Sequence, residues 1–78
     1  MLKGELHEYS EQIVDLIIKE KDKQNLSLSE LARRTGLAKS TLSRYFNKTR
    51  EFPLNRASDF AKSLNVPTEY LLGLKVNH

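Results

Sequence analysis

One short stretch near the middle of the chain is rich in hydrogen-bond donors and contains no acidic residue. It covers residues 33–46 and reads RRTGLAKSTLSRYF. Lysine and arginine donate to phosphate oxygens and to other acceptors, and arginine can do so with two parallel bonds. Serine and threonine hydroxyls donate and accept while occupying little space. A segment of this chemistry suits the binding of a polyanion.

The donors share one face of the helix that the stretch predicts. At about 100° per residue they occupy an arc of roughly 140°, and they are Lys39, Ser40, Ser43, Arg44 and Asn47. The opposite face is apolar and holds Ala38, Leu42, Tyr45 and Phe46, with Thr41 at the edge. A helix enters the DNA major groove only where nothing bulky or negative obstructs it. Small hydroxyls and two cations on one face therefore favour contact with DNA.

The charge of the chain is concentrated around this helix. The net charge of +3 over 78 residues divides into −3 for residues 1–32, +6 for residues 33–56 and zero for residues 57–78. A basic block between acidic and neutral segments indicates a local polyanion site. For basic clusters in general, a merely solvated surface is about as common an explanation as nucleic-acid binding. Here the position of the charges on one helix face favours nucleic-acid binding.

Several classes of function are disfavoured by what the sequence lacks. There is no cysteine, and the two histidines, His7 and His78, lie near opposite ends, so neither a disulfide nor a zinc site is expected. No nucleophile and base, metal cluster or phosphate loop is evident, so we expect no catalytic residue, cofactor or small-molecule ligand. No apolar run is long enough for a membrane span, and the N-terminus does not resemble a signal peptide. A cytoplasmic protein is expected.

Helical periodicity predicts five helices and no strand, which places the chain in the all-α class. We expect them at about residues 6–23, 27–36, 38–47, 53–65 and 67–73. Ser27 and Glu30 have the spacing of a capping box, and Gly36 suits the left-handed turn after a helix. Asn25 and Asn65 are expected to end their helices. The residues predicted to form the core are Tyr9, Ile13, Leu31, Leu42, Phe46, Phe60 and Leu64.

Residues 28–45 resemble the helix-turn-helix of the phage-repressor and Cro-like (lambda repressor-like) family. The matching positions are Ala32, Gly36, Leu37, Leu42 and Tyr45, and the downstream segment FAKSLNVPTEYLLG is also family-like. The resemblance covers about residues 9–74. It implies a compact five-helix domain whose second and third helices form the motif, with double-stranded DNA as the partner. It also implies a homodimer through the fifth helix or the segment after it, where the apolar residues are Tyr70, Leu71, Leu72, Leu74 and Val76.

The sequence departs from the family pattern at four positions. Leu28 stands where many relatives have a phosphate-binding glutamine, and Ala38 replaces the serine or threonine that usually caps the recognition helix. Lys48 replaces a common glycine, and Thr35 is more polar than the usual residue before the turn. These changes are expected to alter affinity and docking while leaving the fold intact.

The motif assigns roles to two sets of residues. The candidates for reading bases lie early in the recognition helix and are Lys39, Ser40, Thr41, Ser43 and Arg44. The candidates for phosphate contact are Ser27, Ser29, Asn47, Lys48 and Arg50. Arg33 and Arg34 have two alternatives, which are ion pairs with the acidic first helix and a role in DNA binding. Arg56 also has two, which are phosphate contact and plain solvation. The acids Glu8, Glu11 and Asp15 are expected to form a solvated face.

Together these features predict a sequence-specific transcriptional regulator that binds double-stranded DNA. A prophage-type repressor that binds a palindromic operator as a dimer is the first interpretation. An antitoxin or developmental regulator, and a protein-interaction module on the same scaffold, are the alternatives. Residues 1–78 are expected to form a single helix-turn-helix domain. Relatives that end in YLLG frequently continue into a second domain, so the N-terminal part of a longer repressor remains an alternative.

Overall fold

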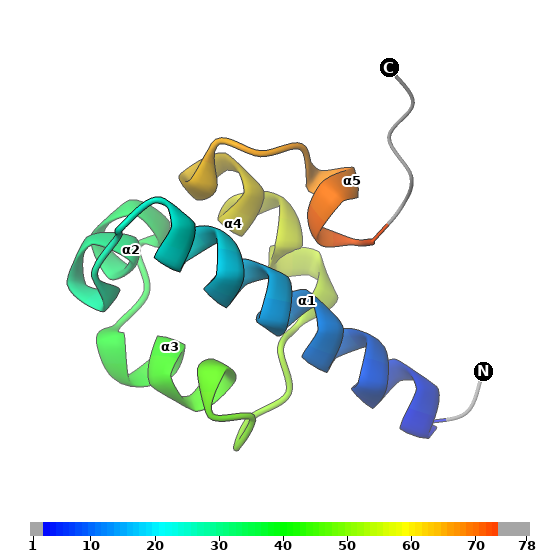
Figure 1. Cartoon of the computed structure of the whole chain (residues 1–78). Helices are drawn as coiled ribbons and strands as arrows, with labels where there is room; N and C mark the ends of the chain where they lie inside the picture. Colours follow the sequence, from blue (N-terminus) through cyan, green and yellow to red (C-terminus); the bar gives the residue numbers. More distant parts are fainter. Residues whose placement is uncertain (1–2, 74–78) are drawn as a thin grey trace.

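Residues 3–73 form six helical segments, and the longest of them crosses this part of the chain from end to end (Figure 1). The computed structural model describes the backbone of residues 3–73 and the side chains of residues 9–73. Within this range the segments are α1 (Lys3–Lys23), α2 (Leu28–Thr35), α3 (Lys39–Phe46), η1 (Leu54–Arg56), α4 (Ala57–Leu64) and α5 (Thr68–Leu71), and no strand is present. In Figure 1, α3 lies on one side of α1 and α4 on the other, and α1 packs against both. The predicted all-α, five-helix class is confirmed.

Helix α1 ends at the residues that the sequence indicated. Asn25 follows it with a φ of 57°, a left-handed conformation that asparagine tolerates better than most residues. The Asn25 N–H donates to the Asp22 carbonyl and the Leu26 N–H to the Lys21 carbonyl, each at 3.0 Å. These bonds close the last turn and direct the chain into α2. The start of α1 at Lys3 lies three residues before the predicted position.

Helix α2 has the two caps that its sequence predicts. The Ser27 hydroxyl accepts a hydrogen bond from the Glu30 backbone N–H at 3.0 Å, which satisfies one of the free donors at the helix start. Gly36 follows the helix with a φ of 75°, and its N–H donates to the Ala32 carbonyl at 2.9 Å. The Thr35 hydroxyl donates to the Leu31 carbonyl at 2.9 Å. The polar residue before the turn is therefore satisfied within its own helix.

A substitution at Gly36 tests how much the turn depends on glycine. A Cβ atom added there meets no atom within 4 Å, so the positive φ is the only obstacle to a side chain. Gly36→Val should lower the free energy of unfolding by roughly 1–2 kcal/mol, measured by urea denaturation. Gly36→Asn should lower it less, because asparagine visits this conformation more readily. Equal stability of the valine variant and the native protein would show that the turn does not need glycine.

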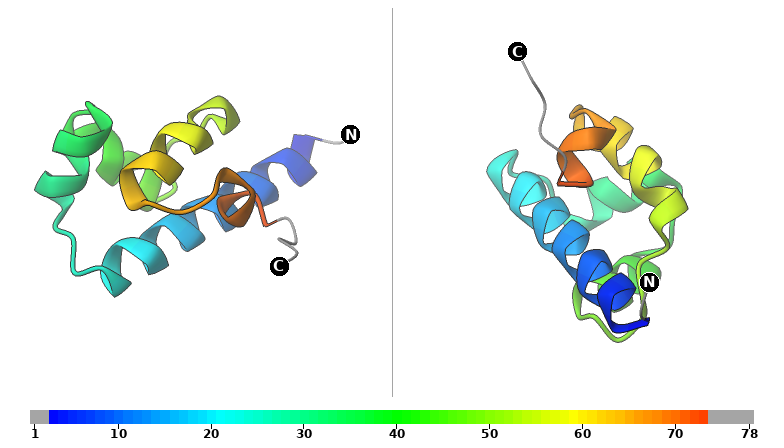
Figure 2. Two further views of the ribbon diagram at one scale, coloured as in Figure 1. Left: turned by 90° about the horizontal axis from the view of Figure 1, so that it is seen from above. Right: turned by 90° about the vertical axis from the view of Figure 1, so that its right-hand side faces the viewer.

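The region predicted as one helix over residues 53–65 is divided in two. Pro53 is the N-cap of η1, and its carbonyl accepts from the Arg56 N–H at 3.0 Å, which closes a short 3-10 turn. Such turns are frequent at the N-termini of α-helices. Helix α4 then runs from Ala57 and ends at Asn65, which has a φ of 60° as its predicted role requires. Helix α5 is shorter than expected and lies against α1 and α4 (Figure 2).

The core contains a phenylalanine that is not among the seven residues predicted to form it. Phe52, in the connection between α3 and η1, is 2% exposed. Its ring meets the rings of Tyr45 and Phe60 edge to face, with centroids 5.4 Å and 5.1 Å apart. Of the seven predicted core residues, five are buried, while Tyr9 and Phe46 are half-buried. The connection after α3 is therefore anchored in the core, although its composition resembles that of an exposed linker.

Candidate nucleic-acid interface

Helix α3 is held by its apolar face and presents its polar face to solvent. Leu42 is fully buried and Tyr45 is 5% exposed, while Lys39, Ser40 and Arg44 are exposed. The two remaining base-reading candidates, Thr41 and Ser43, are half-buried at the edge of this face. The helix wheel drawn from the sequence is therefore correct for Leu42, Tyr45 and the donors, whereas Ala38, placed on the apolar face, is exposed and Phe46 is half-buried. We call the exposed set Lys39, Ser40 and Arg44, with Thr41 and Ser43 at its edge, the α3 polar face.

The cations of the α3 polar face differ from most other cations around them. Within residues 9–73, the side chains of Lys39, Ser40 and Arg44 make no hydrogen bond or ion pair. Arg34 and Arg56, by contrast, pair with Glu30 at 3.0 Å and with Asp59 at 3.3 Å. The donors of the α3 polar face are thus available to an external acceptor.

The N-terminus of α3 lacks the side-chain cap found in α2. Ala38 occupies the N-cap with a φ of −69° and a ψ of 148°, and it makes no capping hydrogen bond. Ser27, the working cap of α2, has nearly the same conformation, with a φ of −77° and a ψ of 162°. The backbone at Ala38 is therefore already shaped for a capping hydroxyl. The start of α3 is thus left without a side-chain cap from its N-cap residue.

A capping residue introduced at Ala38 should stabilise the domain. Ala38→Ser is expected to raise the free energy of unfolding by about 1 kcal/mol, because its hydroxyl can accept from a free N–H in the first turn of α3. Urea denaturation measures the change. Ala38→Val, which has no acceptor, is the control and should give no gain. Identical denaturation midpoints for the two variants would exclude capping as the missing interaction.

The N-terminus of α2 supplies the two serines predicted to meet phosphate. Ser27 and Ser29 are both exposed. The Ser27 hydroxyl is engaged by the Glu30 N–H, so its capping role is confirmed. The N-terminus of a helix attracts anions through its free N–H groups and its dipole. Phosphate contact at this end of α2 stays a prediction.

The connection after α3 carries the other three phosphate candidates, and all of them are exposed. Asn47 is the C-cap of α3, and its N–H donates to the Ser43 carbonyl at 2.8 Å. The N–H groups of Thr49 and Arg50 both donate to the Arg44 carbonyl, at 3.0 Å and 3.3 Å. The backbone of this connection is therefore fixed to the end of α3. Lys48 has a φ of 62°, which is unusual for a residue other than glycine.

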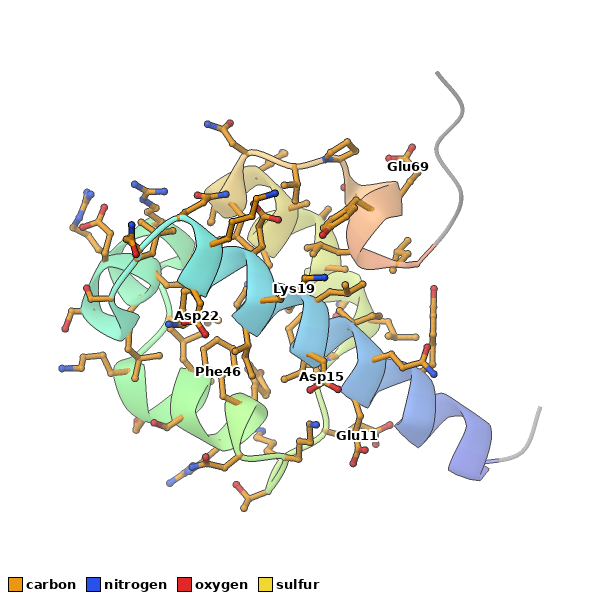
Figure 3. All side chains as sticks on the ribbon, viewed as in Figure 1. Glu11, Asp15, Lys19, Asp22, Phe46 and Glu69 are labelled. Atoms are coloured by element: carbon orange, nitrogen blue, oxygen red, sulfur yellow. The ribbon has the colours of Figure 1, made fainter. Side chains whose placement is uncertain are left out.

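Asp15 lies on a solvated face of α1 as expected, but it also has an ion-pair partner that the sequence did not indicate. The Lys48 Nζ donates to the Asp15 Oδ1 at 2.8 Å, which links α1 to the connection after α3. In Figure 3, Asp15 and Glu11 extend from α1 on the side where this connection lies. The hydrogen bond to Asp15 raises the pKa of the Lys48 ammonium above its ordinary value, and the Glu11 charge contributes. The sequence contains no local spacing that could reveal this pair.

The ion-pair partner expected for Arg33 and Arg34 is also different from the one observed. Both guanidiniums pair with Glu30 of their own helix and not with α1. Their hydrogen bonds, with Arg33 contributing most, lower the pKa of the Glu30 carboxyl below its ordinary value. Arg34 also donates to the Ser63 carbonyl at 3.1 Å and so joins α2 to α4. The i,i+3 and i,i+4 spacing of these residues could have predicted the pairing.

The described part of the chain contains neither a cluster of metal-ligating side chains nor a membrane-spanning helix. Among the side chains of residues 9–73, no group of three histidine, cysteine, aspartate or glutamate residues is arranged to hold a metal ion. None of the helices described here has the length and apolar character that a bilayer crossing requires.

The fold and the α3 polar face together define a class of protein. A capped helix, a glycine turn and a second short helix with an exposed basic face form a helix-turn-helix within an all-α domain. A family model described as Helix-turn-helix matches residues 17–71, which is more than half of the chain. The chain belongs to this lambda repressor/Cro-like helix-turn-helix family, and it is a DNA-binding transcriptional regulator. Searches of curated proteins and of solved structures gave no significant match.

Proposed function

We propose that the protein is a prophage-type repressor that binds a specific sequence of double-stranded DNA by placing α3 in the major groove. The observation that carries this proposal is the α3 polar face, whose lysine and arginine have no partner within residues 9–73. Lysine and arginine donate to the O6 and N7 acceptors of guanine in the major groove. Short hydroxyl side chains let the helix approach closely and can bond to bases or phosphates.

The two sets of predicted contacts divide the work of binding. Base reading is assigned to Lys39, Ser40, Thr41, Ser43 and Arg44, and phosphate contact to Ser27, Ser29, Asn47, Lys48 and Arg50. Phosphate contacts supply affinity and make it depend on salt, while base contacts supply sequence preference. The phosphate candidates lie at both ends of the motif. They would therefore fix its orientation on the duplex.

A dimer on a palindromic operator completes the proposal. One recognition helix contacts only a few base pairs, so two copies with half-sites about one helical turn apart are expected. Tyr70 and Leu72, on and just after α5, are half-buried and offer apolar surface for such a contact. Leu74 and Val76, assigned to the same role from the sequence, lie outside the described residues.

Selection of bound sequences from random duplex DNA tests this function. We expect a palindromic consensus whose half-sites are separated by about one turn of DNA. A consensus without symmetry would retain sequence-specific binding and contradict the dimer. The absence of any enriched sequence would contradict the repressor proposal and favour the alternatives with a protein partner.

A further inference from the structure

Lys48 is the one phosphate candidate whose charge is already matched within residues 9–73. Its ammonium lies 2.8 Å from the Asp15 carboxylate, across 33 positions of sequence. The side chains of the other candidate cations on this surface, Lys39, Arg44 and Arg50, make no ion pair in the described part of the chain. Lys48 and Arg50 thus lie in the same connection, but within residues 9–73 only Lys48 is paired with a carboxylate.

The pair is placed where an exchange of partners is feasible. The Asp15 side chain is 62% exposed and the Lys48 side chain 34% exposed, and ion pairs at such exposure are weak enough for an external anion to displace. The Lys48 backbone N–H donates to the Tyr45 carbonyl at 3.1 Å, so the base of the side chain stays fixed at the end of α3. Only the flexible stem of the lysine needs to move for its ammonium to reach a phosphate.

We propose that Asp15 is an intramolecular competitor of the DNA backbone, which holds the Lys48 ammonium in the free protein and thereby limits the affinity of the helix-turn-helix for DNA. This inference rests on the proposed function and deepens it. A phosphate that takes Lys48 must replace a carboxylate that is already there, so the exchange gains little. Asp15 is thus a regulatory residue that lies outside the motif it controls.

The proposal makes a specific statement about salt. Each phosphate that a protein cation neutralises contributes about 0.9 to the slope of log K against log salt concentration. Lys48 should contribute little of this in the native protein, because its charge is matched before DNA arrives. Arg50 should contribute its full share, because no carboxylate holds it within residues 9–73.

A double-mutant cycle on duplex binding tests the exchange. The probe is the selected duplex, or a mixed-sequence duplex if selection enriches none, titrated at several salt concentrations. Asp15→Asn should raise affinity about two- to fivefold at low salt and steepen the salt slope by about one unit. In a chain that also carries Lys48→Gln, the same substitution should have almost no effect. Arg50→Gln should flatten the slope by about one unit with or without Asp15.

Glu51→Gln is the matched control for the loss of a negative charge. Glu51 is exposed in the same connection and makes no ion pair within residues 9–73, so its effect on affinity should be the same with and without Lys48→Gln. Thermal unfolding of each variant confirms that the fold is kept. The gain from Asp15→Asn should persist when affinity is calculated per folded molecule.

Three results would overturn the inference. An equal gain from Asp15→Asn with and without Lys48 would indicate general repulsion, and weaker binding would indicate that the pair positions the connection for DNA. In both cases duplex binding itself persists, so the proposed function stands. The third result, no duplex binding by either the native protein or the Asp15→Asn variant, would overturn the proposed function together with the inference.

Discussion

Phe52→Ala is expected to lower the free energy of unfolding by about 3–5 kcal/mol, the usual cost of truncating a buried phenylalanine. Phe52 is 2% exposed and packs edge to face against Tyr45 of α3 and Phe60 of α4. A domain of this size has a total stability of roughly 4–12 kcal/mol, so this loss is a large share of the total and should shift the denaturation midpoint strongly to lower urea concentration. Urea denaturation followed by circular dichroism measures the change.

A second substitution at Phe52 tests whether the loss of stability comes from the lost apolar volume or from any change at this position. Phe52→Leu keeps most of the apolar volume and should cost less than about 2 kcal/mol. Phe46→Ala removes a half-buried aromatic ring from the neighbouring helix and should cost less than Phe52→Ala. A loss below 1 kcal/mol for Phe52→Ala would contradict the anchoring of the connection after α3 through this ring.

Arg44→Ala should weaken binding to the selected operator by about 1–3 kcal/mol and relax the sequence preference at one base position. The guanidinium is exposed on α3 and has no partner within residues 9–73. No intramolecular interaction of this side chain therefore has to be broken before it binds DNA. Alanine keeps the backbone carbonyl that accepts from Thr49 and Arg50. The loss should therefore reflect the missing side chain and not a disordered connection.

Lys62→Ala is the control for Arg44→Ala. Lys62 is exposed on α4, which packs against α1, α2 and α5, and its loss removes the same charge from another part of the surface. It should leave the sequence preference unchanged. Binding of the Arg44→Ala variant that is weaker by the same factor for every duplex would contradict base reading by Arg44 and assign it to the phosphate backbone.

The helix-turn-helix itself was predictable because local chemistry determines it. Ser27 caps the helix that it precedes, and Gly36 takes the left-handed conformation that ends it. The division of α3 into buried and exposed faces follows from helical periodicity alone. Such features depend on residues within a few positions of one another, so a single sequence is enough to locate them.

The remaining features depend on residues that are distant in the sequence. Phe52 has no helical periodicity around it, and only the positions of Tyr45 and Phe60 make it part of the core. The pair of Asp15 and Lys48 spans 33 positions and exists because α1 passes beside the end of α3. The start of α1, three residues earlier than predicted, and the 3-10 turn before α4 are boundary details, which a sequence pattern locates least well. The fold was thus predictable at the level of elements, and the long-range contacts were not.

The α3 polar face is the surface that we propose to meet DNA. The most direct measurement is a titration of the isotope-labelled protein with the selected duplex, followed by the backbone amide signals. We predict that the largest shifts fall within residues 39–44, with smaller ones at residues 27–29 and 47–50. Large shifts confined to α5 or the exposed side of α1, with the signals of α3 unchanged, would contradict the claim.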